Sequence, residues 1–398
     1  MRILINDHAG HPFQVQLSRS LAGRGHEILH SYCGLLQTPR GALSKRESDP
    51  NTFSIKSINL SQPFSRYTMA KRALQERALG GLVSREIQRF KPDTVISANT
   101  PLGTQKAIVR ACEKENSQFI YWVQDLLGIG IRNNLVKKLP FLGKFVGNYY
   151  ISLEHSLLRR SDQVILITED FNPVMEKAGV LKDKTHVIHN WAPIDEVPLF
   201  PKSNPWSREN GLDRKFCFIY TGTLGMKHNP ELVIKLALGF KHRDDVRIVV
   251  ITEGLGADYL KSEIEKRGLN NFIIMPFQSF EAMPMVLAAA DILLAILEPD
   301  AGVFAVPSKV LTYLCSQRPL LLSVPPENLA ARIVKNNKAG IVVSPSDSDA
   351  FFGASEALFS DNDLRLNLAK NGRAYAEKAF DIDKITDRFE EIIMKNLN

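Results

Sequence analysis

Short apolar runs alternate with amphipathic helical segments along nearly the whole chain. Residues 1–6 are an apolar run typical of a strand, and the next segment repeats apolar side chains at Phe13, Leu17 and Leu21 before ending at Gly25. Together with a second strand-like run after Gly25, this opening predicts a βαβ unit. Further strands of the first half are predicted at residues 92–100, 118–126, 161–171 and 184–190, and a long helix at about 67–90. Parallel strands gather their carboxyl ends at one edge, so we expect the polar residues there to bind ligand.

The alternation restarts after a segment of different composition. Residues 191–214 are rich in proline and have little apolar periodicity, which predicts a linker. The chain is then helical from Asp361, with a break near Asp381. Between these segments, strands are predicted at residues 216–222, 245–254, 271–277, 291–297, 318–324 and 339–344. The pattern predicts two Rossmann-like α/β halves, joined by the linker and separated by a cleft.

The composition fits a soluble globular protein with anionic partners. The 398 residues allow two or three domains, and the hydrophobic and charged fractions are 44% and 23%. A net charge of +7 favours a phosphate ligand or an anionic membrane surface. Nucleic acid is disfavoured, because no dense Arg/Lys tract with interleaved aromatic residues occurs outside residues 132–160.

The spacing of the cysteines and the length of the apolar runs indicate in which cellular compartment the protein is expected. The four cysteines are Cys33, Cys112, Cys217 and Cys315. They lie far apart without zinc-ligand spacing, so we expect no disulfide framework, no metal site and a reducing cytoplasm. The first residues are typical of a strand rather than a signal peptide. The most apolar run, residues 286–297, is interrupted by Asp291 and is shorter than the roughly 20 residues that span a bilayer.

The stretch from Cys217 to Leu238 predicts a strand, a tight loop and a helix. Gly222 and Gly225 bracket the loop, where backbone without Cβ atoms can approach a ligand. Asn229 is predicted as the N-cap and Pro230 as the first helical residue. Free helical N–H groups and the charge of Lys227 would then form an anion pocket suited to phosphate. The alternative is an ordinary turn whose Lys227 points into solvent.

Residues 132–160 combine basic and aromatic side chains in an amphipathic pattern. Lys137, Lys138 and Lys144 interleave with apolar residues such as Phe141 and Phe145. Such a segment can lie on an anionic membrane surface, or can pack its apolar side on the sheet as an ordinary helix.

The order of motifs resembles that of family-4 glycosyltransferases, which are retaining enzymes of the GT-B fold. In the second half, that family's order and spacing are matched by YTGTLGMKHNPELVI (220–234), by residues 251–277, by residues 279–297 and by PSKVLTYLCSQRPLLLS (307–323). In the first half, residues 8–29 and the run RRSDQVILITEDF followed by VIHNWAPID are also similar to it. The PSK sequence is similar to enzymes of bacterial surface-polysaccharide and O-antigen assembly, including transferases of N-acetylfucosamine-type amino-deoxysugars.

The resemblance implies a specific organisation and reaction. Residues 1–195 would form the acceptor domain, residues 196–375 the nucleotide-sugar domain, and a final helix at about 376–398 would cross back to the first. The donor would be a UDP-sugar, the acceptor a polyprenyl-diphosphate-linked saccharide, and the reaction would need no metal. The enzyme would then be cytoplasmic and peripheral on the inner face of the bacterial plasma membrane.

The resemblance also assigns residues to the donor diphosphate. Lys227 takes the place of the diphosphate cation, and Lys309 in PSK would support it. Thr223 stands where many members have arginine. Gly222 and Gly225 would let the backbone approach the phosphates.

Other positions of the second half would hold the nucleoside and sugar. Glu253 and Gly254 would line the same edge, and residues Met275 to Phe277 would read the nucleobase. The family's paired glutamates are replaced by Phe304 and Thr312, so the substitutes for their contacts are expected nearby. These candidates are Asp300 for sugar hydroxyls and Ser308 for phosphate or ribose.

Two residues of the first half are candidates for the acceptor side. Asp125 follows a strand and could orient or deprotonate an acceptor hydroxyl, or could be an N-cap. His11 lies in the first loop and could hydrogen-bond a substrate, or could be a surface histidine. Two other functions stay open: a nucleotide-sugar epimerase or hydrolase of the same fold, and a non-catalytic nucleotide-sugar-binding partner.

Overall fold

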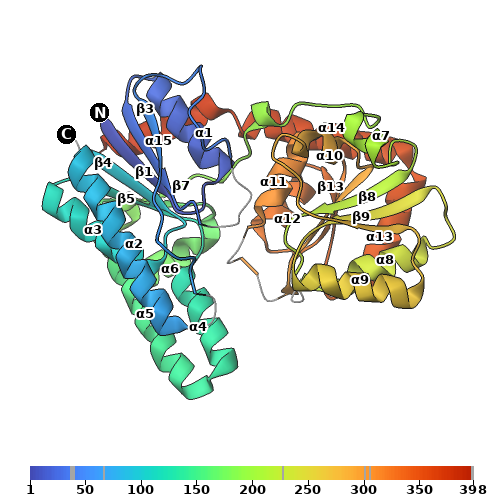
Figure 1. Ribbon diagram of the computed structural model, residues 1–398, viewed down its shortest axis with the longest axis horizontal. Coiled ribbons are helices and arrows are strands. Elements are labelled where there is room, and N and C mark those ends of the chain that lie inside the picture. Colours follow the sequence, from blue (N-terminus) through green and yellow to red (C-terminus); the bar gives the residue numbers. More distant parts are fainter. Residues whose placement is uncertain (36–40, 66–67, 226–227, 300–301, 304–305, 396–398) are drawn as a thin grey trace. The chain divides into compact units, whose positions relative to one another are not determined.

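The computed structural model describes residues 1–35, 41–65, 68–225, 228–299, 302–303 and 306–395. Contacts divide the chain into two compact units. Unit 1 consists of residues 1–190 together with the segment from Ile382 onward, and unit 2 of residues 191–381. Each unit is an α/β layer structure with helices on both faces of a parallel sheet (Figure 1).

Unit 1 is built on seven parallel strands in the order β3-β2-β1-β4-β5-β6-β7. The strands are β1 (Arg2–Asp7), β2 (Glu27–Tyr32), β3 (Phe53–Ser57), β4 (Thr94–Ala98), β5 (Gln118–Val123), β6 (Gln163–Leu166) and β7 (Thr185–Val187). The helices are α1 (Pro12–Gly23), α2 (Met69–Phe90), α3 (Leu102–Glu115), α4 (Leu127–Lys138), α5 (Pro140–Arg160), α6 (Asn172–Ala178) and α15 (Ile382–Met394). All the strands predicted for this half are present, because continuous apolar runs such as Ile3 to Ile5 are buried from both faces.

Helix α15 packs on unit 1 although it lies at the other end of the sequence. Its Phe389 ring contacts the buried Trp122 ring at a centroid distance of 4.9 Å. Arg24, just after α1, pairs with Asp387 and Glu390 of α15. Apolar burial and this charge cluster together hold α15 against α1 and the sheet.

Unit 2 is built on six parallel strands in the order β10-β9-β8-β11-β12-β13. The strands are β8 (Phe216–Thr221), β9 (Val246–Ile251), β10 (Phe272–Met275), β11 (Ile292–Ile296), β12 (Leu320–Ser323) and β13 (Gly340–Val343). The helices are α7 (Pro205–Glu209), α8 (Glu231–Gly239), α9 (Leu255–Arg267), α10 (Met283–Ala288), α11 (Ser308–Cys315), α12 (Leu329–Asn336), α13 (Ser348–Ser360) and α14 (Asn362–Ala379). All six strands lie where the apolar runs predict them.

The segment predicted as a linker contains a short capped helix, so that prediction is wrong for residues 204–209. Asn204 accepts a hydrogen bond from the backbone N–H of Ser207 and caps α7. Trp206 is buried and donates its indole N–H to Gln278 at 2.9 Å. A short capped helix carries too few residues to show periodicity, which is why composition alone suggested a linker.

The four cysteines are buried and unbridged. Within the described ranges, no helix is long and apolar enough to cross a membrane. The apolar run at 286–297 is divided between the end of α10 and strand β11.

Candidate functional site

The centre of unit 2 has the geometry at which doubly wound sheets bind ligands. Strand β8 lies between β9 and β11, and the chain builds outward from this point in both directions. Loops that follow β8 and β11 therefore leave the sheet on opposite faces, and folds of this kind bind ligands at the carboxyl ends of such strands. Helix α11, which begins at Ser308, contributes its N-terminal turn to this edge.

Lys309 reaches this edge from the second residue of α11. Its ammonium nitrogen lies 3.7 Å from the centroid of the Tyr220 ring, at the end of β8. A Cβ atom added at Gly222 would lie 3.1 Å from the same nitrogen, so the ammonium sits directly against the backbone after the strand. No ion pair or hydrogen bond of Lys309 occurs within the part of the chain that the structure describes.

The surroundings of Lys309 are unfavourable for its charge. Burial lowers the pKa of the Lys309 ammonium to about 7, because the ring face of Tyr220 replaces only part of the lost hydration. An anion bound beside Gly222 would reverse this effect and favour the protonated form. The arrangement can thus bind an anionic group and stabilise charge that develops on it.

Two tyrosines fix the end of β8 around Lys309. The Tyr313 hydroxyl, one turn further along α11, accepts a hydrogen bond from the backbone N–H of Thr221 at 2.9 Å. The Tyr220 hydroxyl donates to the carbonyl oxygen of Thr223 at 2.8 Å. Gly222, between Thr221 and Thr223, has a φ of +109°, a backbone conformation that is strained for a residue with a side chain. Our sequence reasoning missed both tyrosines; the spacing of four residues between Lys309 and Tyr313 was the available signal.

The loop after Gly222 differs from its prediction. Asn229 has a φ of +49° and α8 begins at Glu231, so Asn229 is not the N-cap. The turn is instead shaped by His228, whose Nδ1 accepts the backbone N–H of Gly225 at 2.9 Å. The other nitrogen of His228 lies 3.1 Å from Glu298, which follows β11. Lys227 itself lies outside the described residues.

The candidates at or after the ends of β9 and β10 lie at the same edge of the sheet but have different contacts. Glu253 accepts the backbone N–H of Phe277 at 3.1 Å, so it ties the loop after β9 to the segment after β10. Gly254 has a φ of +85° and is the N-cap of α9. Met275 ends β10, and the side chain of Phe277 is 48% exposed.

Two further candidates lie on α11, and a third lies in the loop after β8. Ser308 is exposed and Thr312 partly buried, and their spacing of four residues places them on one side of the helix. Thr223 is exposed in the loop after β8. Asp300 and Phe304 lie outside the described residues, so the positions of the missing glutamates are represented by Thr312 alone.

In unit 1, the corresponding edge carries a network around Asp7. The Asp7 carboxylate accepts the backbone N–H groups of Ala9 and His11, and its Oδ1 lies 3.4 Å from the His11 ring nitrogen. The same nitrogen of His11 lies 3.1 Å from the side-chain amide of Asn99, which has a φ of +52°. Burial opposes the charge of Asp7, but the bonds and charge of His11 outweigh it and lower the pKa of the carboxyl. Neither Asp7, which ends β1, nor Asn99, which follows β4, was predicted from the sequence, although both stand at the carboxyl ends of apolar strands.

His11 is therefore a held residue rather than a free surface histidine. Its side chain is 24% exposed, so it can still present its ring to a ligand. Asp125 follows β5 and is exposed, and the N-cap of α4 is Leu126, so the N-cap alternative for Asp125 is wrong. Desolvation raises the pKa of the Asp125 carboxyl and the His11 charge opposes the rise, while solvent at this exposed residue limits both effects.

A third residue, Glu154 of α5, holds the start of α4. It is 1% exposed and accepts the backbone N–H of Gly128 at 3.1 Å. Burial raises the pKa of its carboxyl to about 7, although the N–H groups of Gly128 and Leu127 oppose this. Glu154 thereby fixes the helical hairpin α4–α5 to the loop that carries Asp125.

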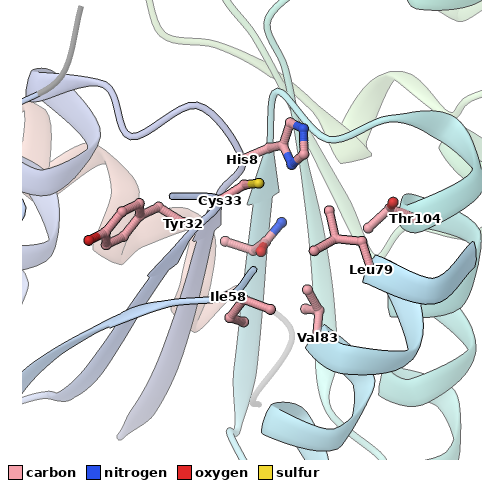
Figure 2. Close-up of a pocket in the computed structure, with 8 residues that line it drawn as sticks. His8, Tyr32, Cys33, Ile58, Leu79, Val83 and Thr104 are labelled. Carbon is pink, nitrogen blue, oxygen red and sulfur yellow. The ribbon is translucent and has the colours of Figure 1, made fainter. Parts of the chain in front are cut away.

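His8 follows Asp7 in the sequence, and its side chain is buried. Figure 2 shows its ring beside Cys33, with Ile58, Leu79 and Val83 toward the other end of the group. These side chains leave no room for a water molecule. Burial, assisted by the charge of Arg72, lowers the pKa of His8 to about 4, so the ring is neutral. We therefore assign His8 to the core rather than to a ligand site.

Within the described ranges, no group of three or more His, Cys, Asp and Glu side chains is arranged to hold a metal ion. The metal-free reaction stays a prediction.

Residues 203–375 match the family described as glycosyl transferases group 1. Over 233 residues, the chain is 26% identical to WcaI of Escherichia coli strain K12, named as a colanic acid biosynthesis glycosyl transferase, covering 56% of this chain and 55% of WcaI. Over 245 residues, it is 24% identical to the α-D-kanosaminyltransferase of Streptomyces kanamyceticus, covering 60% of this chain and 62% of that enzyme. The matched segments thus span little more than half the length of each relative.

A solved structure shows the same fold over the whole chain. HepE of Anabaena, crystallised with UDP and glucose, superposes with a TM-score of 0.74, covering 99% of this chain and 100% of HepE at 17% identity. The predicted GT-B fold, with two Rossmann-like units, is confirmed.

Proposed function

We propose that the protein transfers a sugar from a nucleotide diphosphate sugar to an acceptor hydroxyl, because residues 203–375 match the family of glycosyl transferases group 1. The donor is a UDP-sugar; support comes from HepE, which has the same fold and was crystallised with UDP and glucose. The names of WcaI and of the kanosaminyltransferase support an amino sugar or surface-polysaccharide context.

The observation that carries the proposal is the cation at the centre of unit 2. Lys309 lies against the backbone of Gly222 and over the Tyr220 ring, with no anionic partner within the described ranges. The departing UDP gains negative charge as the glycosidic bond breaks, and a preplaced ammonium with a helix N-terminus stabilises that charge. Lys227 is proposed as a second cation for the same group.

The reaction retains the configuration at the anomeric carbon. The bond from that carbon to the diphosphate oxygen breaks, and the acceptor oxygen bonds on the same face. The acceptor proton passes to the diphosphate oxygen, so the protein supplies no nucleophile. Basic side chains take the role that a metal has in other transferases.

Unit 1 is proposed to hold the acceptor. The His11 ring, fixed by Asp7 and Asn99, offers a hydrogen-bonding group at the sheet edge. Asp125 is the carboxylate proposed to orient the acceptor hydroxyl. The acceptor is proposed to be a polyprenyl-diphosphate-linked saccharide, and the transferred sugar an N-acetyl deoxyhexosamine.

The hairpin α4–α5 is proposed to meet an anionic membrane surface on the cytoplasmic side. Its turn exposes Phe141 by 94% and Phe145 by 79%, so the apolar residues of this segment do not all pack on the sheet. Lys137, Lys138 and Lys144 lie on the same hairpin. This combination is typical of segments that bind the interface of anionic bilayers.

A ligand screen tests the donor proposal. UDP or a UDP-sugar at 100 times its Kd should stabilise the protein by about 2.7 kcal/mol, whereas ADP and GDP at the same concentration should not. The stabilising UDP-sugar is then supplied with a polyprenyl-diphosphate saccharide, and the product is identified by mass spectrometry. Conversion of the UDP-sugar without an acceptor would instead favour an epimerase or hydrolase, and binding without any turnover a non-catalytic partner.

A charge reversal tests the membrane proposal. Lys137→Glu with Lys138→Glu should reduce sedimentation with vesicles that contain anionic phospholipid. The same reversal at Lys261 and Lys370, two exposed lysines of unit 2, is the control. Equal sedimentation of both double variants would contradict the role of the hairpin.

A further inference from the structure

A groove of about 820 Å³ runs over the outside of unit 1, among helices α2, α3 and α5. Helix α3 packs against both of the others (Figure 1). Small residues line much of the groove, among them Ala73 on α2 and Ala107 on α3. A Cβ atom added at Gly80 would lie 2.6 Å from that of Ala107, so α2 and α3 approach closely beneath it. The volume lies within the range of roughly 300–1,000 Å³ typical of sites for small molecules.

One wall of the groove is cationic. Lys106, Arg110 and Lys114 line it at intervals of four residues along α3, and Arg77 lines it from α2. A spacing of four places the three α3 side chains in one row on the helix. Within the described ranges, none of the four has an ion pair. The acidic lining residue Glu76 is already paired with Arg72, so the row is not neutralised from within the groove.

The opposite wall is apolar and continues beyond the groove. Leu153 and Tyr149 of α5 line it. Phe145 and Phe141 extend the same four-residue row toward the hairpin turn, where their side chains are 79% and 94% exposed. A helical row with this spacing forms one continuous stripe. The stripe therefore leads from the groove to the part of the protein proposed to meet the membrane.

We propose that the groove binds one anionic phospholipid. Its phosphate pairs with the α3 row Lys106, Arg110 and Lys114, and an acyl chain lies along Tyr149 and Leu153. A basic row beside an exposed aromatic stripe matches the two parts of such a lipid, one charged and one apolar. An acidic partner protein would satisfy the basic row but would leave the stripe toward Phe141 unexplained. The inference deepens the membrane association proposed above and does not depend on sugar transfer.

The test uses the full chain and a lipid that is soluble as a monomer. Dihexanoyl phosphatidylglycerol, kept below its micellar concentration, should bind saturably with one site by calorimetry. Dihexanoyl phosphatidylcholine should bind more weakly, because its headgroup has no net charge. Inorganic phosphate and poly-glutamate, which lack acyl chains, serve as control ligands.

Two variants separate charge from shape. Lys106→Gln with Arg110→Gln and Lys114→Gln should weaken binding of dihexanoyl phosphatidylglycerol roughly tenfold or more. Ala73→Trp, at an exposed position of α2 that lines the groove, should do the same by filling it without a change of charge. The matched control, Lys261→Gln with Lys370→Gln and Lys378→Gln, removes the same charge from exposed sites of unit 2 and should bind as the native chain does. Thermal unfolding of each variant confirms that it is folded.

Each contrary result overturns the proposal in a recognisable way. Equal affinity for inorganic phosphate means a bare anion site, and equal affinity for poly-glutamate means a protein-binding surface. Absence of saturable lipid binding, or lipid binding that Ala73→Trp leaves unchanged, rules out the groove. UDP binding by the same variants is measured in parallel, because a failure of the donor proposal would appear there and not in the lipid titrations.

Discussion

The two units have closely similar sheets but opposite electrostatics at their ligand-binding edges. In unit 1, Asp7 is the last residue of the central strand β1, and its carboxylate accepts hydrogen bonds from the backbone N–H groups of Ala9 and His11. In unit 2, the cation of Lys309 lies at the end of the central strand β8, and no partner neutralises it within the described ranges. The comparison teaches that one fold acquires different chemistry through the few side chains that follow its central strands.

The difference has a functional reading. An unpaired, partly desolvated ammonium gains most from an incoming anion, whereas a satisfied carboxylate–histidine network suits a neutral hydroxyl. We therefore expect substitutions in unit 2 to affect donor binding and substitutions in unit 1 to affect turnover with an intact donor site.

The largest effect is expected from Lys309→Met. Loss of a group that stabilises the developing diphosphate charge should lower transfer by about 10²–10³-fold. It should also weaken UDP binding, because the remaining pocket lacks this cation. Initial rates and UDP titrations measure both effects. Native rates in a folded Lys309→Met protein would contradict the role of Lys309 in stabilising the diphosphate.

A smaller effect of a different kind is expected from His11→Gln. Turnover should fall roughly 10–100-fold, since general acid–base or positioning contacts typically contribute this much or more. UDP affinity should stay native, because His11 belongs to unit 1. Weakened UDP binding in His11→Gln would contradict the proposal that unit 2 binds the donor and unit 1 the acceptor.

Raising the pH should selectively weaken donor binding. Burial holds the pKa of Lys309 at about 7, and bound diphosphate raises it, so above pH 7 the complex holds more protons than the free protein. The Kd for UDP should therefore increase from pH 7 to pH 9, by up to about tenfold per pH unit. Calorimetry in two buffers of different ionisation enthalpy should detect proton uptake at pH 8.

Lys309→Arg is the control for this pH dependence. A guanidinium stays charged from pH 7 to pH 9, so the Kd of this variant for UDP should not increase over that range. If the Kd of Lys309→Arg for UDP increased with pH as it does in the native protein, another group would be responsible for the pH dependence.

The smallest effect is expected from Tyr313→Phe. The variant loses the hydroxyl that accepts the Thr221 N–H, which should cost about 1 kcal/mol of unfolding free energy. UDP affinity should fall only a few-fold, since the end of β8 loosens while Lys309 remains. Urea unfolding and UDP titration measure the two changes. Native stability and native UDP affinity in Tyr313→Phe would contradict a role of this hydroxyl in holding the end of β8 for donor binding.

The sequence was sufficient for elements whose signal is local. Runs such as residues 291–297 predicted strands correctly, because a strand buried on both faces must be apolar throughout. The GT-B fold was likewise confirmed, because the solved HepE structure superposes over 99% of this chain, and the family model matches residues 203–375 of the second half.

The candidate site was predicted only in part, because its contacts are tertiary. Lys309 was proposed for its place in PSK, but its position over Tyr220 depends on how α11 meets β8. Asn229 was misassigned because a hydrogen bond between Gly225 and His228 closes the turn first. The residue types around Asn229 suit a cap equally well, so no local pattern could distinguish the two.

The return of α15 to unit 1 means that unit 1 could not be obtained whole by dividing the polypeptide at one peptide bond. A fragment that ends at Asn190 would leave the Trp122 indole without the Phe389 ring and Arg24 without its acidic partners on α15. Two covalent crossings therefore tie the units together, and an intact N-terminal fragment would require residues 382–395 to be added back in trans or joined by a new connection.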